Sequence, residues 1–111
     1  MAVTATQSKQ PADTANLAVG RYLDTGTVAN TPCVITTGFK PRVVIVKNVT
    51  SGDSYEWYEG MAAASAYKRV TAGDATIITT LGITVSDRGF TIGDDTDIRV
   101  SSEQLSWMAM G

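Results

Sequence analysis

Histidine is absent from the 111 residues, and cysteine occurs once. Because histidine is the commonest general base and the commonest transition-metal ligand, its absence excludes most of the common types of catalytic and metal-binding site. Cys33 has no second cysteine for a disulfide and no histidine for a catalytic pair. We therefore expect Cys33 to be a small buried apolar residue. We also expect no bound metal, no cofactor and no enzymatic activity.

Long apolar runs and clusters of positive charge are also missing. No segment reaches the roughly 18 apolar residues of a membrane span, and the first residues lack the basic-then-apolar pattern of a secretion signal. The net charge is −2, and the local basic groups are two pairs, Lys40 with Arg42 and Lys68 with Arg69. Neutralising nucleic-acid phosphates requires more clustered Lys and Arg. We expect neither a membrane nor a nucleic acid as a partner.

The pattern that is present is typical of β-structure. Residues 1–16 are polar and small, which predicts a flexible N-terminal arm, and residues 17–111 are predicted to form a single β-domain. Short runs of β-branched and aromatic residues then alternate with Gly, Asp and Ser turn signals. The predicted strands cover residues 17–23, 32–37, 43–46, 54–59, 75–80, 83–85, 90–92, 98–100 and 105–109. The segment Met61–Tyr67, which contains the run Ala62-Ala63-Ala64, predicts a loop or one helical turn.

About eight short strands with regular turn signals indicate an all-β fold, a compact antiparallel β-sandwich or barrel with an extended N-terminal arm. The strongest strand signal is Val43-Val44-Ile45-Val46, where both alternating faces are apolar. This pattern predicts a central strand that is buried on both sides.

Carboxylate groups are the strongest candidates for a metal-binding or catalytic site in this sequence. Asp94, Asp95 and Asp97 lie close together in a loop, and calcium prefers such oxygen ligands. The EF-hand spacing and its closing Glu are missing, so a solvated β-turn is the favoured interpretation. Glu56 and Glu59 lie on one short strand, which provides no cleft between two opposed carboxyl groups.

The aromatic residues give the candidate interface. Tyr55, Trp57 and Tyr58 lie within four residues, and Met61 follows Gly60. Tyr and Trp are enriched in the energetic centres of protein interfaces, which makes Tyr55, Trp57, Tyr58 and Met61 candidate interface residues. Core packing is the default for Trp57. If Tyr55 and Trp57 face the core, alternation directs Tyr58 outward.

Several motifs together resemble a known group of proteins. They are Gly38–Asn48 (GFKPRVVIVKN), Trp57, Gly60-Met61, Thr71-Ala72-Gly73, Gly82-Ile83-Thr84, Arg88–Ile92 (RGFTI), Trp107 and Gly111. Over roughly residues 18–111 the chain resembles small virion proteins of tailed bacteriophages, and a related pattern occurs in phage tail-fibre tip domains. The resemblance implies a capsid decoration (cement) protein, or a head-fibre or tail-fibre piece, with a compact β-sandwich or barrel fold.

The function expected from this resemblance is structural. The chain is expected to bind the outside of a phage capsid and to stabilise it, after synthesis in the host bacterial cytoplasm. The implied partners are the major capsid protein and further copies of the chain, with a homotrimer favoured. The alternative is a tail-fibre or receptor- or glycan-binding domain, which requires an exposed aromatic cluster around Trp57 and Tyr58. A small cell-wall hydrolase and a neck or tail-completion protein are further alternatives.

Overall fold

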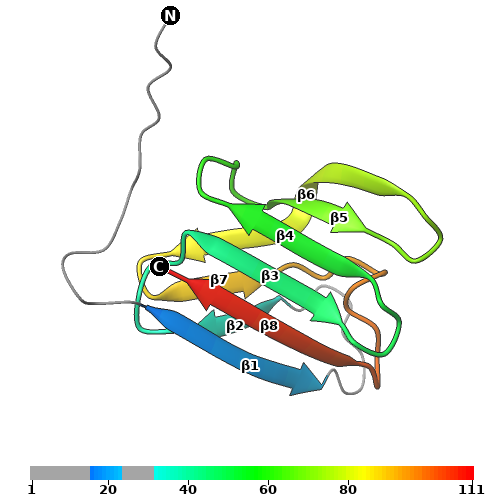
Figure 1. The fold of residues 1–111 in the computed structure, drawn as a ribbon, viewed down its shortest axis with the longest axis horizontal. Helices are drawn as coiled ribbons and strands as arrows, with labels where there is room; N and C mark the ends of the chain where they lie inside the picture. Colours follow the sequence, from blue (N-terminus) through cyan, green and yellow to red (C-terminus); the bar gives the residue numbers. More distant parts are fainter. Residues whose placement is uncertain (1–15, 24–31) are drawn as a thin grey trace, which may run out of the picture.

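The computed structural model describes residues 16–23 and 32–111, and within them every regular element is a strand (Figure 1). The strands are β1 (Leu17–Leu23), β2 (Cys33–Thr36), β3 (Val43–Asn48), β4 (Ser54–Tyr58), β5 (Ser65–Arg69), β6 (Ala75–Ser86), β7 (Gly89–Ile92) and β8 (Gln104–Met110). The predicted all-β class is confirmed. Of the arm predicted for residues 1–16, residues 1–15 lie outside the described part of the chain. Among the described residues, no helix is long and apolar enough to cross a membrane.

All eight strands belong to one antiparallel sheet, in the order β1-β8-β3-β4-β5-β6-β7-β2. The sheet curls into an open half-barrel rather than closing, which leaves β1 and β2 as its two edges. In Figure 1, β1, β8, β3 and β4 lie side by side as one layer, while β7 and β2 lie behind them. The central position of β3 in its layer agrees with the strength of its sequence signal.

The curl depends on a bend in β6, the longest strand at twelve residues. Residues 75–78 pair with β5, and residues 83–86 pair with β7. Between them Leu81 adopts a φ of 61°, and the Tyr55 hydroxyl donates a hydrogen bond of 2.8 Å to the Leu81 carbonyl. A Cβ on Gly82 would lie only 2.5 Å from a carbonyl carbon at the start of β5. The bend therefore requires glycine at this position, because the two backbones touch.

The concave side of the sheet holds the core. Phe90 of β7 and Trp107 of β8 meet edge to face at 5.4 Å, although their strands lie far apart in the sheet order. This contact shows that the layer containing β8 and the strand β7 behind it pack against one shared interior. The buried apolar residues are Cys33, Val44, Val46, Tyr55, Trp57, Ala66, Ile83, Phe90, Ile92, Ile98, Leu105 and Ala109.

The prediction of a strand at Ile98–Val100 is wrong, because this segment belongs to the connection between β7 and β8. The backbone N–H groups of Ile98 and Arg99 both donate to the Asp95 carbonyl, at 3.2 and 2.8 Å, which closes a turn. Ile98 is fully buried and Arg99 is 2% exposed. Their alternating pattern reflects packing of a loop against the core, which periodicity alone does not distinguish from a strand.

Two further boundaries are corrected. The segment predicted as a loop or helical turn ends early, since β5 begins at Ser65 and pairs with β6 through a bulge. Ser65 and Ala66 are buried there, so tertiary pairing overrides the helix propensity of the preceding alanines. The two strands predicted at residues 75–80 and 83–85 are one bent strand.

Candidate interaction surface

The convex side of the layer formed by β1, β8, β3 and β4 is the candidate functional surface. On β3 the side chains alternate strictly, with Val44 and Val46 fully buried and Val43 and Ile45 only half-buried on the opposite face. The prediction that this strand is buried on both sides is therefore wrong for the described residues. The convex apolar face of β3 has no described element packed over it.

The strand register places apolar residues of four strands in one cross-strand row. Leu17 pairs with Met110, Met110 with Val43, and Val43 with Tyr58. Leu17 is 61% exposed, Tyr58 44% and Met110 40%. Directly opposed residues in antiparallel strands have Cβ atoms about 5 Å apart, so these four side chains form a continuous strip.

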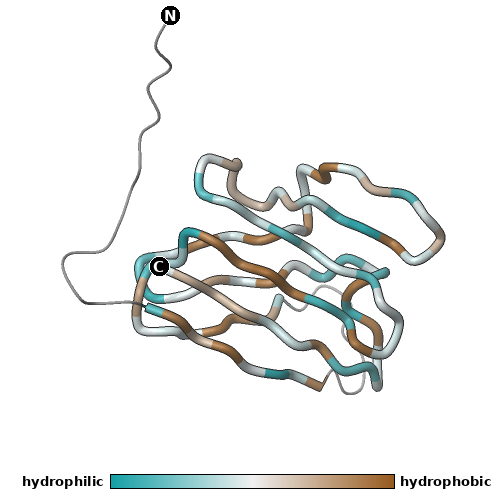
Figure 2. The backbone as a smooth tube through the Cα atoms, in the orientation of Figure 1, coloured by the Kyte–Doolittle hydropathy of each residue, from teal (hydrophilic) through white to brown (hydrophobic). Residues whose placement is uncertain are grey.

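A second row lies beside the first, two residues along each strand. Val19 pairs with Met108, and Met108 pairs with Ile45. Val19 is the most exposed of these, at 69%. We call the two rows together the outer patch. It consists of Leu17, Val19, Val43, Ile45, Tyr58, Met108 and Met110. Figure 2 shows the hydrophobic residues that recur along β1 and the hydrophobic run of β3.

The next cross-strand row is polar and borders the outer patch. Arg21 pairs with Ser106, Ser106 with Lys47, and Lys47 with Ser54 of β4. A shallow hollow of about 210 Å³ lies at this boundary, lined by Ile45, Lys47, Ser106, Trp107 and Met108. Sites for small molecules usually enclose about 300–1,000 Å³. A contiguous apolar face with a polar border instead indicates contact with a macromolecule.

The four candidate interface residues divide between the core and the surface. Tyr55 is fully buried and Trp57 is 8% exposed, with its indole N–H directed at the Ala62 carbonyl at 3.3 Å. Both belong to the core, as their position on the inner face of β4 dictates. Met61 is half-buried and its sulfur accepts a hydrogen bond from the Tyr58 N–H at 3.2 Å. Only Tyr58 joins the outer patch.

The rest of the outer patch was not identified as an interface from the sequence. The signal that could have found it is the alternation within Leu17–Leu23, where every second residue is exposed and three of those four are apolar. Polar residues are expected at solvent-facing positions of a strand. An apolar outward face at a sheet edge is a departure from that rule.

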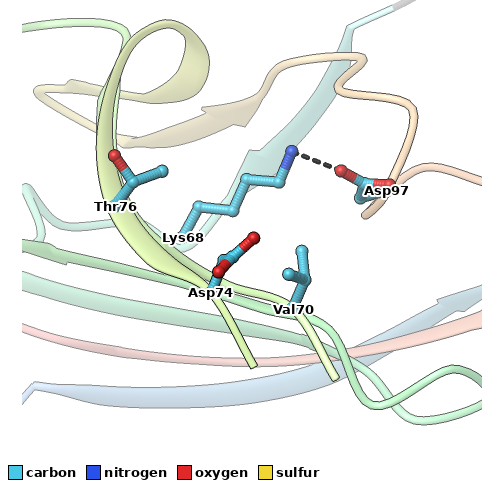
Figure 3. A pocket seen from close by; sticks show the side chains of 5 residues that line it. All are labelled: Lys68, Val70, Asp74, Thr76 and Asp97. Carbon is cyan, nitrogen blue, oxygen red and sulfur yellow. Dashed lines mark ion pairs between the residues drawn. The ribbon is translucent and has the colours of Figure 1, made fainter. Parts of the chain in front are cut away.

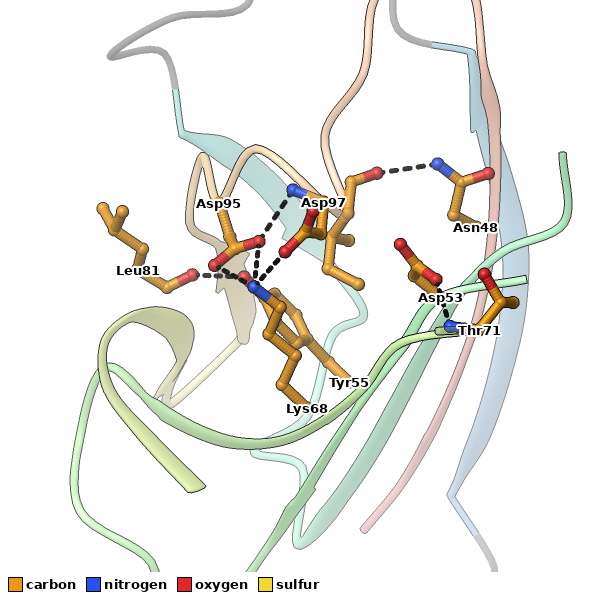
Figure 4. A network of polar contacts seen from close by, with 9 residues as sticks. Asn48, Asp53, Tyr55, Lys68, Thr71, Leu81, Asp95 and Asp97 are labelled. Atoms are coloured by element: carbon orange, nitrogen blue, oxygen red, sulfur yellow. Dashed lines mark hydrogen bonds and ion pairs between the residues drawn. The ribbon is translucent and has the colours of Figure 1, made fainter. Parts of the chain in front are cut away.

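A second notable feature is a polar network inside the half-barrel (Figure 4). The Lys68 ammonium lies 2.9 Å and 3.0 Å from the two carboxylate oxygens of Asp95 and 2.6 Å from Asp97. The Lys68 and Asp95 side chains are only 14% and 13% exposed, whereas Asp97 is 50% exposed. The prediction of a solvated turn is thus wrong for Asp95, which is buried and paired with Lys68. Among the described residues no group of three or more His, Cys, Asp or Glu could hold a metal ion.

The network affects the pKa of Lys68 and of the neighbouring Tyr55. Burial alone lowers the pKa of Lys68, but hydrogen bonds to Asp97 and Asp95 outweigh burial and leave its pKa above the ordinary lysine value. Burial raises the pKa of Tyr55 far above that of a free tyrosine, and the nearby Asp95 and Asp97 charges add to this. Tyr55 is therefore a neutral donor to the Leu81 carbonyl at any physiological pH.

A small pocket of about 210 Å³ adjoins this network and is lined by Lys68, Val70, Asp74, Thr76 and Asp97 (Figure 3). The Lys68 ammonium points toward Asp97 and is already paired with it at 2.6 Å. The network thus anchors the loop between β7 and β8 to β5. Asn48 anchors the same loop from β3, because its amide donates to the Ile98 carbonyl at 3.0 Å.

Comparisons with known proteins give no family for the chain. No protein-family model matches it, and searches of curated proteins and of solved structures return no match. The resemblance to phage virion proteins consequently stays a prediction. The geometry of the outer patch does not depend on that resemblance.

Proposed function

We propose that this chain is a non-catalytic structural protein that binds the outside of a tailed-phage capsid and stabilises it. The observation that carries the proposal is the outer patch, an apolar surface that spans four neighbouring strands and that no described element covers. The phage assignment comes from the sequence resemblance, and the patch supplies the contact surface that such a role needs.

Binding would be driven by removal of the outer patch from water. Burying apolar surface contributes about 25 cal/mol per Å², and a stable contact needs about 800 Å² from each partner. Many equivalent copies on one shell gain further stabilisation from avidity. The major capsid protein is the proposed partner, since a decoration protein must bridge its copies.

The proposed contact is tested by adding the purified chain to phage heads that lack it and measuring co-sedimentation. Ile45→Lys places a positive charge inside the outer patch. The new lysine lies opposite Glu56 of β4, and this opposite-charge pair across the strands supports folding of the variant. Val34→Lys is the matched control, because Val34 is 71% exposed on β2, outside the outer patch. We expect Ile45→Lys to weaken head binding at least about tenfold and Val34→Lys to bind like the wild type.

Copy number in purified virions separates decoration from other structural roles. A decoration protein is present in hundreds of copies, whereas a neck or tail-completion ring holds about six or twelve. Equal binding by both lysine variants, or density for the chain only at the tail in cryo-electron microscopy, would overturn the proposal.

The glycan-binding alternative receives no such support. It required an exposed aromatic cluster around Trp57 and Tyr58, and Trp57 is 8% exposed. Tyr58 alone on a flat apolar face provides neither the stacking partner nor the groove of a sugar site.

A further inference from the structure

The edge strand β1 directs a row of backbone groups away from the sheet. The Gly111 N–H donates to the Asn16 carbonyl at 3.0 Å, so residues 16 and 111 form a hydrogen-bonded pair of the antiparallel ladder. Such pairs alternate with non-hydrogen-bonded pairs. The even-numbered residues of β1 therefore bond to β8. The odd-numbered residues Leu17, Val19, Arg21 and Leu23 present their N–H and C=O groups on the side where no described strand lies.

This edge lacks the usual protection against pairing. Natural edge strands are short, or carry Pro, Lys or a bulge that blocks a second chain. β1 is seven residues long, keeps one regular register with β8 and has Arg21 as its single charged residue. A long regular edge of this kind is a template for another strand.

We propose that two copies of the chain associate by antiparallel pairing of their β1 strands across a two-fold axis at Gly20. In this register Leu17 lies opposite Leu23 of the second copy, and Val19 lies opposite Arg21 of the second copy. Odd-numbered residues thus face odd-numbered residues, so all the outward backbone groups of both strands form hydrogen bonds. The contact is isologous, because each copy contributes the same strand.

The inner side chains are complementary in size in the same register. Ala18 lies opposite Tyr22 of the second copy, so a small residue faces a large one at each end. The two Gly20 residues face each other at the axis, with the Trp107 ring of each copy packed over its own glycine. A Cβ on Gly20 would lie 2.4 Å from a Trp107 ring carbon, so this position has no room for a side chain within one copy.

The outer side chains gain contacts that one copy cannot provide. Leu23 is 50% exposed and pairs in its own sheet with Gln104, at the polar end of the layer. Across the axis it meets Leu17 of the second copy, so each outer patch is extended by one leucine of the other copy. The contact is two-fold, unlike the trimer that the resemblance implies, and it does not depend on capsid binding.

Sedimentation of the full chain with a proline variant tests the contact. The Val19 N–H points to the open edge, so Val19→Pro removes a donor of the proposed contact and none of the bonds to β8. Val19→Thr keeps the donor and is the matched control. We expect the wild type and Val19→Thr to sediment as dimers and Val19→Pro to sediment as a folded monomer.

Cross-linking tests the register and does not depend on the proline variant. Hydrogen-bonded pairs place Cα atoms about 5.5 Å apart, within disulfide range. The double variant Leu17→Cys/Leu23→Cys should form an intermolecular disulfide, while Leu17→Cys/Arg21→Cys should not; the wild type reports any background from Cys33. A wild-type monomer or trimer, a dimer that persists in Val19→Pro, or equal cross-linking of both cysteine pairs would overturn the proposal.

Discussion

Replacement of Lys68 by methionine tests the polar network most directly. Methionine is an unbranched side chain one heavy atom shorter than lysine, and it removes the charge that lies 2.9 Å from Asp95 and 2.6 Å from Asp97. Asp97 is half exposed and turns to solvent at little cost. Asp95 is 13% exposed and would remain as a buried carboxylate without its cation.

The expected loss follows from that burial. Breaking a buried pair by removing one partner costs about 3–5 kcal/mol. Asp95 keeps a hydrogen bond from the Asp97 N–H at 2.9 Å, so the lower end, about 3 kcal/mol, is expected. For a domain of this size the melting temperature then falls by roughly 10–20 °C. The variant should still fold at room temperature, because total stability is typically about 5–15 kcal/mol.

Circular dichroism during heating and during urea titration at neutral pH measures the loss. Arg42→Met is the matched control, since Arg42 and Glu59 lie 4.0 Å apart and are 27% and 58% exposed. Exposed pairs contribute about 0–1 kcal/mol. Adding Asp95→Asn to Lys68→Met should recover part of the loss, because the uncompensated charge is then gone. If Lys68→Met costs no more than Arg42→Met, the network does not anchor the loop.

Two further predictions concern the interior. Tyr55 has a raised pKa in the folded chain, so its stabilising effect is complete below the ordinary tyrosine pKa of about 10 and declines above it, by up to about 1.4 kcal/mol per pH unit. The raised pKa of Lys68 likewise makes stability decline as the pH rises above the ordinary lysine pKa. Tyr55→Phe should therefore flatten the alkaline decline in urea stability and cost about 1 kcal/mol near neutral pH through loss of the bond to Leu81; an unchanged slope would refute this. Gly20→Ala should lower stability by about 1–3 kcal/mol, because its Cβ forces the Trp107 ring from its contact with Phe90. An unchanged melting temperature would show that the ring moves freely.

Sequence patterns predicted most of the sheet because its strands alternate and end at turn residues. The predicted bounds of the first strand, Leu17–Leu23, are those of β1. Periodicity failed where apolar residues are spaced by loop packing, as at Ile98, or where one strand bends at Leu81 and resembles two. Both failures depend on contacts with residues far along the chain, and such contacts leave no local signal.

The outer patch was predicted only in part for a related reason. Aromatic residue type suggested Tyr55 and Trp57, but strand parity places both in the core. Leu17 and Val19 alternate as apolar residues along β1, but they form part of a continuous patch only when β8 and β3 are placed beside them. Cross-strand register creates the outer patch, and register between strands distant in sequence was not predicted.

A pair of threonine substitutions on β3 tests whether one face of the sheet is uncovered in the isolated chain. Val43 and Val44 are adjacent valines on opposite faces, half-buried and fully buried respectively. Threonine keeps the β-branched shape, so the added hydroxyl is the main change. Val44→Thr buries that hydroxyl in the core and should cost about 1–3 kcal/mol. Val43→Thr should stay within about 0.5 kcal/mol of the wild type.

The readout for this pair is the urea midpoint at a protein concentration where the wild type is monomeric. Under that condition no second copy shields Val43, and the difference between the two variants reports the two faces of one strand. If Val43→Thr costs as much as Val44→Thr, then the convex face is already covered within a single chain. The outer patch would then not be available to a capsid, and its extension across a two-fold axis would lose its physical basis.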